Sequence, residues 1–309
     1  DEEIAFIDGT CCEFFTPDGK PLKKEIVTVE WNQEKAEKAG YPHFMLKEIF
    51  EQPRAVASSI EPHINLQELS VNLSGAEFGA QKKSAEEVFK NIDRLFIVAC
   101  GTSFYAGLTG KYLIETMAGV PVEVEVASEF RYRDPVVPPR SLVMVISQSG
   151  ETADTLAALR LAKKKGAQTL CICNVPRSSI DRESDARLYM RSGVEVGVAS
   201  TKAFTSTLAL LNVLSIYLAR IKGTMDREIE KKMVRSLVDI PSQMEHVLAH
   251  DKFFKGAAKT LKDAKGFLYI GRGVSYPIAL EGALKLKELA YMHAEGYAAG
   301  EMKHGPIAL

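Results

Sequence analysis

Three segments rich in hydroxyl side chains could bind a phosphate group. They are CGTSFYAG at 100–107, SQSGET at 147–152 and GVASTKAFTST at 197–207. The first two follow an apolar run and precede a helical pattern, and Gly101 and Gly150 would let the backbone approach a ligand closely. Backbone N–H groups at a helix start, together with Ser and Thr hydroxyls, form a neutral cage for a phosphate.

The motifs that accompany larger phosphate ligands are missing. The sequence has no GxxxxGK[ST], and GRGVSY at 271–276 fails the third glycine of GxGxxG. GxSxG is also missing, so Ser147 and Ser149 lack the context of an activated nucleophile. A cage without nucleotide machinery favours a small phosphate monoester, such as a sugar phosphate. The alternative is that these hydroxyls only cap helices, which explains one such turn better than three.

A second candidate group combines two carboxylates and a lysine. In EGALKLKEL, Glu281, Lys285 and Glu288 have i, i+4, i+7 spacing, so they share one stripe of a helix. An aldose–ketose isomerase needs a carboxylate to move a proton between adjacent carbons and a cation to stabilise the developing oxyanion. This stripe follows a glycine turn, which places it near the ligand end of a sheet. The alternative is a surface ladder of ion pairs.

A third candidate is His304, in GEMKHGP. It lies between glycines and before a proline, so we expect a loop. An imidazole there could shuttle the proton that opens a cyclic sugar. The alternative is an exposed loop histidine without a role.

The elements that would position these residues follow an α/β pattern. Short apolar runs alternate with helical patterns from about residue 84, which predicts βαβ units and a parallel sheet buried on both faces. The predicted strands are 95–100, 122–127, 142–147 and 169–174, and the predicted helices are 84–92, 105–119, 151–166 and 204–223. A second round predicts a helix at 240–264, a strand at 267–270 and a helix at 279–293. The shared order of strand, glycine turn and helix indicates an internal repeat.

The N-terminal part has a different pattern. Residues 1–30 alternate like a hairpin around a Pro-Asp-Gly turn, and 32–53 resemble a linker followed by a short amphipathic helix. The chain starts with Asp1 and ends on HGPIAL, so we expect it to be a fragment of a longer protein.

Composition excludes several classes. The 309 residues contain 39 Lys and Arg against 40 Asp and Glu, a net charge of -1, which argues against nucleic-acid binding. The longest apolar stretch, 208–221, is too short to span a bilayer and predicts a buried helix, so we expect no membrane association. The five cysteines form no CxxC pair, which favours the cytoplasm and no metal site.

Several motifs together resemble a known family. CGTS, SQSGETADT, EVGVASTKAFT, IGRG, YPIALEGALKLKE and HAEGYAAGEMKHGP are similar to the isomerase domains of the glutamine–fructose-6-phosphate amidotransferases, which have the sugar isomerase (SIS) fold. HFMLKEIFEQP at 43–53 resembles the segment that joins the glutaminase and isomerase parts of that family. The match covers about residues 41–309.

The resemblance implies an α/β fold with tandem SIS subdomains, each a parallel β-sheet sandwiched by α-helices, the second incomplete in this chain. It implies a remnant of the glutaminase domain and a linker at 1–40, a first SIS subdomain with an N-terminal helical segment at 41–235, and the start of a second at 236–309. It also implies a homodimer in the cytoplasm, with the glutaminase domain of the full-length enzyme as a partner.

The implied reaction converts fructose 6-phosphate to glucosamine 6-phosphate with ammonia from glutamine, the first step of hexosamine synthesis, without cofactor or metal; glucose 6-phosphate is a further ligand. By motif, Glu288 moves the proton from C1 to C2, Lys285 assists at the oxygen, and His304, from the other subunit, promotes ring opening. The phosphate is held by Ser103, Ser147, Gln148, Ser149 and Thr152, and the sugar pocket is lined by Cys100, Gly101, Thr102, Val198, Ala199 and Ser200.

Two departures limit this resemblance. The chain lacks the family's N-terminal nucleophilic cysteine, so we expect this fragment not to hydrolyse glutamine. It also lacks the family's C-terminal tail with an imine-forming lysine, so we expect the sugar site to lack its last wall. Two alternatives stay open: a phosphosugar-binding sensor of the SIS type, and a deglycase acting on fructosamine phosphates. The first does not need Glu288, Lys285 and His304 together, and the linker segment at 43–53 argues against the second.

Overall fold

The computed structural model describes residues 3–25 and 37–308 and divides into two compact units, 1–37 and 38–309. In the first unit, β1 (Ile4–Ile7), β2 (Cys12–Phe15) and β3 (Pro21–Leu22) form an antiparallel sheet. The predicted Pro-Asp-Gly turn is confirmed: the Gly19 N–H donates to the Thr16 carbonyl at 2.8 Å, with Gly19 at φ +83°. The last part of the predicted hairpin, residues 26–30, lies outside the described residues.

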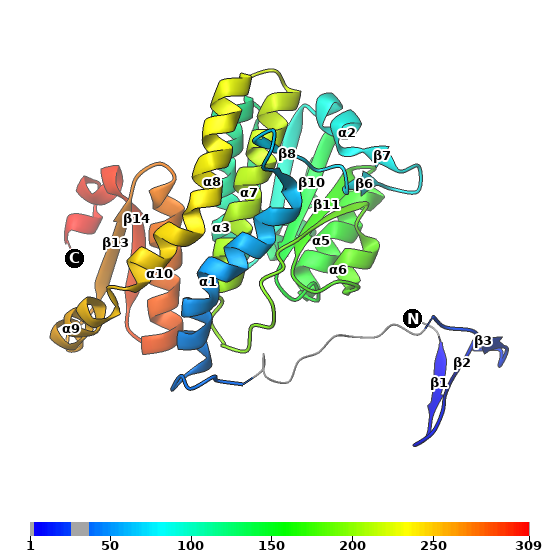
Figure 1. The fold of residues 1–309 in the computed structure, drawn as a ribbon, viewed down its shortest axis with the longest axis horizontal. Helices are drawn as coiled ribbons and strands as arrows, with labels where there is room; N and C mark the ends of the chain where they lie inside the picture. Colours follow the sequence, from blue (N-terminus) through cyan, green and yellow to red (C-terminus); the bar gives the residue numbers. More distant parts are fainter. Residues whose placement is uncertain (1–2, 26–36, 309) are drawn as a thin grey trace. The chain divides into compact units, whose positions relative to one another are not determined.

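A five-stranded parallel sheet forms the centre of the second unit (Figure 1). The order is β12-β11-β10-β8-β9, and the α/β prediction is therefore confirmed. The strands are β8 (Arg94–Ala99), β9 (Val122–Val126), β10 (Ser141–Ser147), β11 (Gln168–Cys173) and β12 (Ala186–Tyr189). Sequence patterns missed β12, because its ARLY sequence is short and not continuously apolar.

The sheet is buried on both faces because alternate strand residues enter different cores. Ile97 of β8 and Met144 of β10 join the larger core with helices α3 (Gly101–Ala118) and α7 (Lys202–Ile221). Val98 and Val145, one residue further along, join the opposite core. That core is covered by the helices α4 (Ala127–Tyr132), α5 (Ala153–Lys164) and α6 (Ser179–Glu183).

Two outer helices cover the larger core. Both α1 (Phe44–Ile60) and α8 (Arg227–Leu248) lie on the α7 side of the sheet (Figure 1). The helix α1 is longer than the amphipathic pattern indicated, since it continues through Pro53 to Ile60. Smaller elements complete this part: η2 (Glu61–His63), β4 (Ile64–Asn65), β5 (Ser70–Val71), β6 (Glu77–Phe78), β7 (Lys83–Ser84) and α2 (Ala85–Asn91).

The helix α7 is long and apolar enough to cross a membrane by length and composition, with a mean hydropathy of 1.5. However, 67% of its most apolar window is buried inside the protein, where α7 packs against α3 and α1. The prediction of a buried helix at 208–221 is confirmed.

The second round of the pattern forms a smaller α/β unit. It contains β13 (Phe267–Gly271), α10 (Ser275–Ala290), β14 (Ala294–Ala298), η3 (Ala299–Lys303) and η4 (Pro306–Ala308), with β13 and β14 paired in parallel. The helices α10 and α3 pack against each other. The division predicted between 235 and 236 falls inside α8 and stays a prediction.

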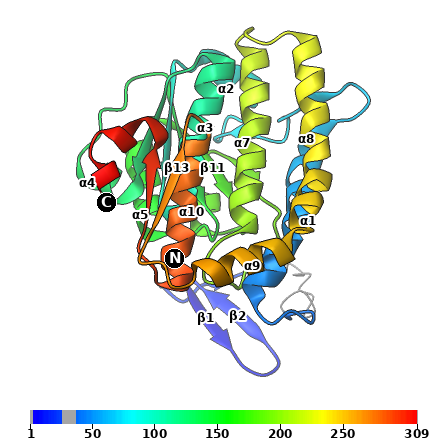
Figure 2. The same cartoon turned by 90° about the vertical axis from the view of Figure 1, so that its left-hand side faces the viewer.

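The single helix predicted at 240–264 is wrong. The chain instead forms α8, which begins after the Asp226 cap and tolerates Pro241, and a separate α9 (Asp251–Leu261) that runs in a different direction (Figure 2). The Phe253 and Phe254 N–H groups donate to the His250 carbonyl and so start the new helix at that point. The amphipathic pattern alone did not mark this break.

Candidate functional site

Two glycine turns lie side by side at the carboxyl edge of the sheet. Ala99 at the end of β8 pairs with Ile146, one residue before the end of β10, so both strands stop at the same level. Each is followed by a glycine in the left-handed region, Gly101 at φ +52° and Gly150 at φ +68°. At Gly150 a Cβ would lie 1.9 Å from the Ser178 hydroxyl oxygen, so only glycine fits.

The turn at 147–152 is organised by its own hydroxyls. The Gly150 N–H donates to the Ser147 hydroxyl at 3.0 Å, and this hydroxyl lies 2.9 Å from the hydroxyl of Thr152. The Glu151 N–H donates to the Ser149 hydroxyl at 3.1 Å, while the Gln148 carbonyl accepts a bond from the Asn174 N–H at 3.1 Å. These hydrogen bonds fix the conformation of the turn.

The residues at three N-cap positions do not cap their helices through their side chains. Cys100, Thr152 and Thr201 occupy the N-cap positions of α3, α5 and α7, and none of the three side chains makes a capping hydrogen bond. The Cys100 sulfur instead lies 3.8 Å from the Thr155 hydroxyl, and Ser103 is half-buried in the first turn of α3. The N–H groups at the starts of α3 and α5 have no side-chain cap among the described residues, as a phosphate site requires. At α7, the Glu195 carboxylate accepts from the Thr201 and Ala203 N–H groups at 2.8 and 3.4 Å, so this helix start is already capped.

The carboxylate–lysine stripe of α10 meets the first turn of α3. Thr102 donates its hydroxyl to Glu281 Oε1 at 3.0 Å and accepts a bond from Lys285 Nζ at 2.9 Å. Lys285 Nζ also lies 3.3 Å from Glu281 and 2.6 Å from Glu288. The prediction that the three residues share a stripe is confirmed. The half-buried contact with Thr102 of α3 joins this stripe to a second helix, which a surface ladder of ion pairs on one helix does not do.

Burial sets the electrostatics of this group. The Glu281 side chain is 6% exposed, and its Oε2 atom has no hydrogen-bond partner among the residues that the structure describes. Burial raises the pKa of its carboxyl above the ordinary 4.5, and Lys285 and Thr102 only partly offset the effect. The Glu288 side chain is 35% exposed, so this carboxylate is open to a ligand while Lys285 holds it.

The third hydroxyl segment is a loop before α7. Val198 is 99% exposed, Ala199 is buried, and the Ser200 hydroxyl donates to Glu195 Oε2 at 3.0 Å. Asn174 connects the residues that lead toward this segment to the second turn, since its side chain accepts bonds from Ser192 and donates to the Gly193 carbonyl at 2.7 Å, and its N–H donates to the Gln148 carbonyl. No role was predicted from the sequence for Asn174, or for Glu195, although Glu195 begins the motif EVGVASTKAFT.

The structure does not bring His304 to the other predicted residues. It is exposed at the end of η3, and its backbone N–H donates to the Glu301 carbonyl at 2.9 Å. Among the described residues of this chain, no hydrogen bond or ion pair joins its ring to Lys285 or Glu288. Its predicted role therefore stays a prediction.

One buried cluster has potential metal ligands. Cys171, Cys173 and Asp181 bring their ligand atoms within 4.8 Å of one another. However, the Asp181 carboxylate already accepts bonds from the Tyr189 hydroxyl and the Arg177 N–H and pairs with Arg187 at 3.2 Å. The hydrogen bond with Cys171 and burial raise the pKa of the Cys173 thiol, which disfavours a thiolate ligand. We therefore assign no metal to this cluster.

Comparison with known proteins agrees with this geometry. A family model of the SIS domain matches residues 89–217 and 260–309, so the chain belongs to the SIS domain family. Within that family, it is similar to the isomerizing glutamine–fructose-6-phosphate aminotransferases: it is 46% identical to that of Clostridium tetani and 50% identical to that of Bacteroides thetaiotaomicron, over the whole chain. The chain spans 50% of the length of each relative.

Solved structures show the same relationship. The C-terminal domain of glucosamine-fructose-6-phosphate aminotransferase from Francisella tularensis matches 88% of this chain and 74% of its own, with a TM-score of 0.84 and 46% identity. The tagatose-6-phosphate ketose/aldose isomerase of Escherichia coli has a TM-score of 0.66 over 88% of this chain and 72% of its own, at 19% identity, which indicates a shared fold alone.

Replacing Glu281 by Gln should change the pH dependence of stability. A carboxyl whose pKa rises on folding binds protons more tightly in the folded state, so stability falls as pH rises through the window between the two pKa values. We expect the unfolding free energy of the wild type minus that of Glu281→Gln to fall as pH rises above 4.5, and to level off above the folded pKa. Urea denaturation across this range measures the difference; a flat or rising difference would contradict the prediction.

Proposed function

We propose that this chain is the sugar-phosphate isomerase part of an enzyme that makes glucosamine 6-phosphate from fructose 6-phosphate and glutamine-derived ammonia. The observation that carries the proposal is the contact of Lys285 with Thr102, Glu281 and Glu288 beside two glycine turns. It supplies a carboxylate, a cation and a phosphate-binding edge in one place. The names of the relatives at 46–50% identity support the same reaction.

The phosphate binds at the turn of 147–152 and the start of α3. The turn presents hydroxyls and backbone N–H groups, and the helix starts add positive potential. The anion is held by Ser103, Ser147, Gln148, Ser149 and Thr152, and the sugar is contacted by Cys100, Gly101, Thr102, Val198, Ala199 and Ser200. A local cage of this kind needs no positive net charge on the whole chain.

The proton transfer uses the exposed end of the α10 stripe. Ammonia condenses with the C2 carbonyl of the open-chain sugar, and water leaves. Glu288 then removes a proton from C1 and returns it at C2, while the C1 hydroxyl proton passes to nitrogen, which leaves an aldehyde at C1 and an amino group at C2. Lys285 stabilises the negative charge that develops on the substrate oxygen, and Thr102 and Glu281 fix the position of its ammonium group. Of the two glutamates, Glu288 is better suited to act as the base because it is more exposed than Glu281.

His304 opens the sugar ring from a neighbouring subunit. The exposed position of His304 in this chain is compatible with a contact to a second copy. We therefore propose a homodimer in which each site contains one partner's His304. The reaction takes place in the cytoplasm without metal or cofactor, and a glutaminase domain supplies the ammonia.

A related deglycase is the competing enzyme. The same site could cleave fructosamine 6-phosphate, and a sensor could bind the sugar phosphate without turnover. Supplying fructose 6-phosphate with ammonia and, separately, fructosamine 6-phosphate distinguishes them. We expect product only from the first mixture; consumption of fructosamine 6-phosphate alone would favour the deglycase, and binding without any turnover would favour the sensor.

Glu288→Gln should separate binding from chemistry. The amide keeps the size of the side chain but cannot accept the proton, so exchange of solvent hydrogen into fructose 6-phosphate should fall by at least about 100-fold, a typical contribution of a general base. Calorimetric binding should change little. Glu245→Gln, at an exposed glutamate of α8, serves as the control and should keep wild-type exchange. Unchanged exchange in Glu288→Gln would refute the role of this residue.

Mixing two inactive variants tests the donation of His304. If each site combines Glu288 of one chain with His304 of the other, a mixed dimer of Glu288→Gln and His304→Ala contains one intact site. Random mixing should then restore about a quarter of the wild-type exchange rate. The two variants measured separately are the controls. No recovery in mixtures shown to contain mixed dimers would place both residues in the site of one chain.

A further inference from the structure

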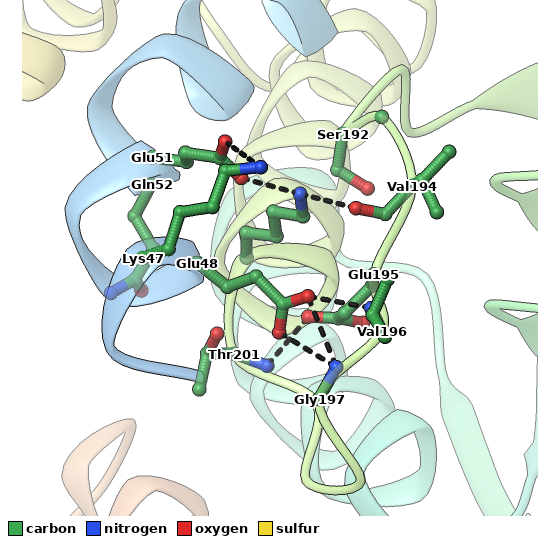
Figure 3. Close-up of polar contacts among 12 residues, drawn as sticks. Lys47, Glu48, Glu51, Gln52, Ser192, Val194, Glu195, Val196, Gly197 and Thr201 are labelled. Carbon is green, nitrogen blue, oxygen red and sulfur yellow. Dashed lines mark hydrogen bonds and ion pairs between the residues drawn. The ribbon is translucent and has the colours of Figure 1, made fainter. Parts of the chain in front are cut away.

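We propose that Glu48 of α1 is a positioning residue for the sugar-contacting loop, defined here as Val198–Ser200. This inference rests on the proposed function of that loop. Glu48 lies 148 residues before Val196 in the sequence, within the segment 43–53 that resembles a joining segment, and no role in the site was predicted for it from the sequence. Its side chain nevertheless points directly at the backbone that leads into the loop (Figure 3).

The Glu48 carboxylate binds two consecutive backbone N–H groups. Its Oε1 accepts from Val196 at 2.5 Å and from Gly197 at 3.1 Å, and its Oε2 accepts from Gly197 at 3.2 Å. Glu48 is only 2% exposed, so these bonds replace the water that an ionised carboxylate would otherwise bind. Charge-assisted bonds in a buried setting are strong and directional. They fix the position of the residue that immediately precedes Val198.

Gly197 is shaped to this contact. A Cβ at this position would lie 2.5 Å from Glu48 Oε2 and 3.4 Å from the Met45 Cα. Any larger residue would push the carboxylate or the backbone away. The glycine is thus needed for close approach to α1 rather than for an unusual backbone angle.

The same segment is held on both sides of the Glu48 contact. Lys202, which is 3% exposed, donates to the Val194 carbonyl at 2.6 Å and to Glu51 Oε2 at 2.7 Å, which adds a second carboxylate from α1. Beyond the loop, Glu195 Oε1 accepts from the Thr201 N–H at 2.8 Å.

The loop therefore depends on side chains for its shape. Residues 194–201 belong to no helix or strand, so no backbone ladder fixes them. Their anchored neighbours leave Val198 fully exposed at the tip, where a ligand can meet it. A shift of the Val196–Gly197 backbone would move this loop relative to the turn at 147–152. Displacement of about 1 Å in a binding site can cost up to about 100-fold in activity.

The experiment compares Glu48→Ala and Glu48→Gln with Glu61→Gln, a control at an exposed glutamate just after α1. Calorimetry measures the dissociation constant for fructose 6-phosphate, and hydrogen–deuterium exchange measures protection of the peptide at 194–201. We expect Glu48→Ala to weaken binding by about 10- to 100-fold and to speed exchange in that peptide. The Gln variant keeps one acceptor oxygen and should be intermediate. The peptide that contains β10 should keep its protection in every variant.

A double-mutant cycle with Gly197→Ala gives a second test. The added methyl group should displace the carboxylate, so Gly197→Ala alone should weaken binding and loosen the 194–201 peptide. In the Glu48→Ala background that clash disappears, and the second substitution should add less than its effect alone. If Glu48 contributed only to stability, Glu48→Ala would lower the melting temperature without weakening the binding of fructose 6-phosphate or speeding exchange at 194–201.

The outcomes separate the two proposals. The positioning role is overturned if the wild-type chain binds fructose 6-phosphate and Glu48→Ala binds it with the same affinity. It is also overturned if Glu48→Ala leaves hydrogen–deuterium exchange at 194–201 unchanged. Failure of the wild-type chain to bind fructose 6-phosphate overturns the proposed function. Faster local exchange in Glu48→Ala would then still establish that Glu48 fixes the segment, but the assignment of that segment to a sugar site would fall.

Discussion

The parallel pairing of β8 with β10 determines where the candidate site lies. Because Ala99 is paired with Ile146, β8 and β10 end at the same edge of the sheet and at nearly the same level. Each must turn into a helix within a few residues, and a glycine with positive φ makes each turn possible. The N–H groups at the starts of α3 and α5 therefore converge on one region of the surface. Without this register the hydroxyl-rich turns would be unrelated features of the sequence.

The carboxylate–lysine group of the candidate site combines a buried carboxyl with nearby charge. Glu281 is a carboxylate with little access to water, which raises its pKa, and only the Thr102 hydroxyl and the Lys285 ammonium compensate for this. Lys285 is consequently held between α3 and α10, and its remaining contact is the more exposed Glu288. The buried Glu281 thus holds Lys285, which in turn contacts the proposed base Glu288. Glu281 itself is too enclosed to take the proposed role of base.

Much of this architecture could be predicted from the sequence. Continuous apolar runs and glycine turns predicted β8, β10 and β11, and i, i+4, i+7 spacing predicted the stripe on α10. These features are local, so periodicity reports them directly. The ends of elements were less predictable: α1 continues through Pro53, and the chain breaks between α8 and α9 without a proline or glycine at the break.

The remaining contacts could not be predicted, because they join distant parts of the chain. Periodicity cannot tell that Glu48 meets the Val196 and Gly197 N–H groups, or that Thr102 meets Lys285, 183 residues away. Glutamates on amphipathic helices usually face solvent, so nothing in the sequence distinguished the buried Glu48 from its exposed counterparts. Long-range polar contacts of this kind position the site, and only the three-dimensional arrangement reveals them.

The most direct test of the central claim is a crystal structure of the chain with fructose 6-phosphate bound. We predict that the phosphate group lies on the turn at 147–152 against the start of α3, with C1 and C2 of the sugar facing Glu288. Phosphate density at another place, such as the surface cavity lined by Arg220 and Arg227, would contradict the account. A sugar bound at the predicted turn but with C1 and C2 directed away from Glu288 would contradict the proposed chemistry while preserving the binding site.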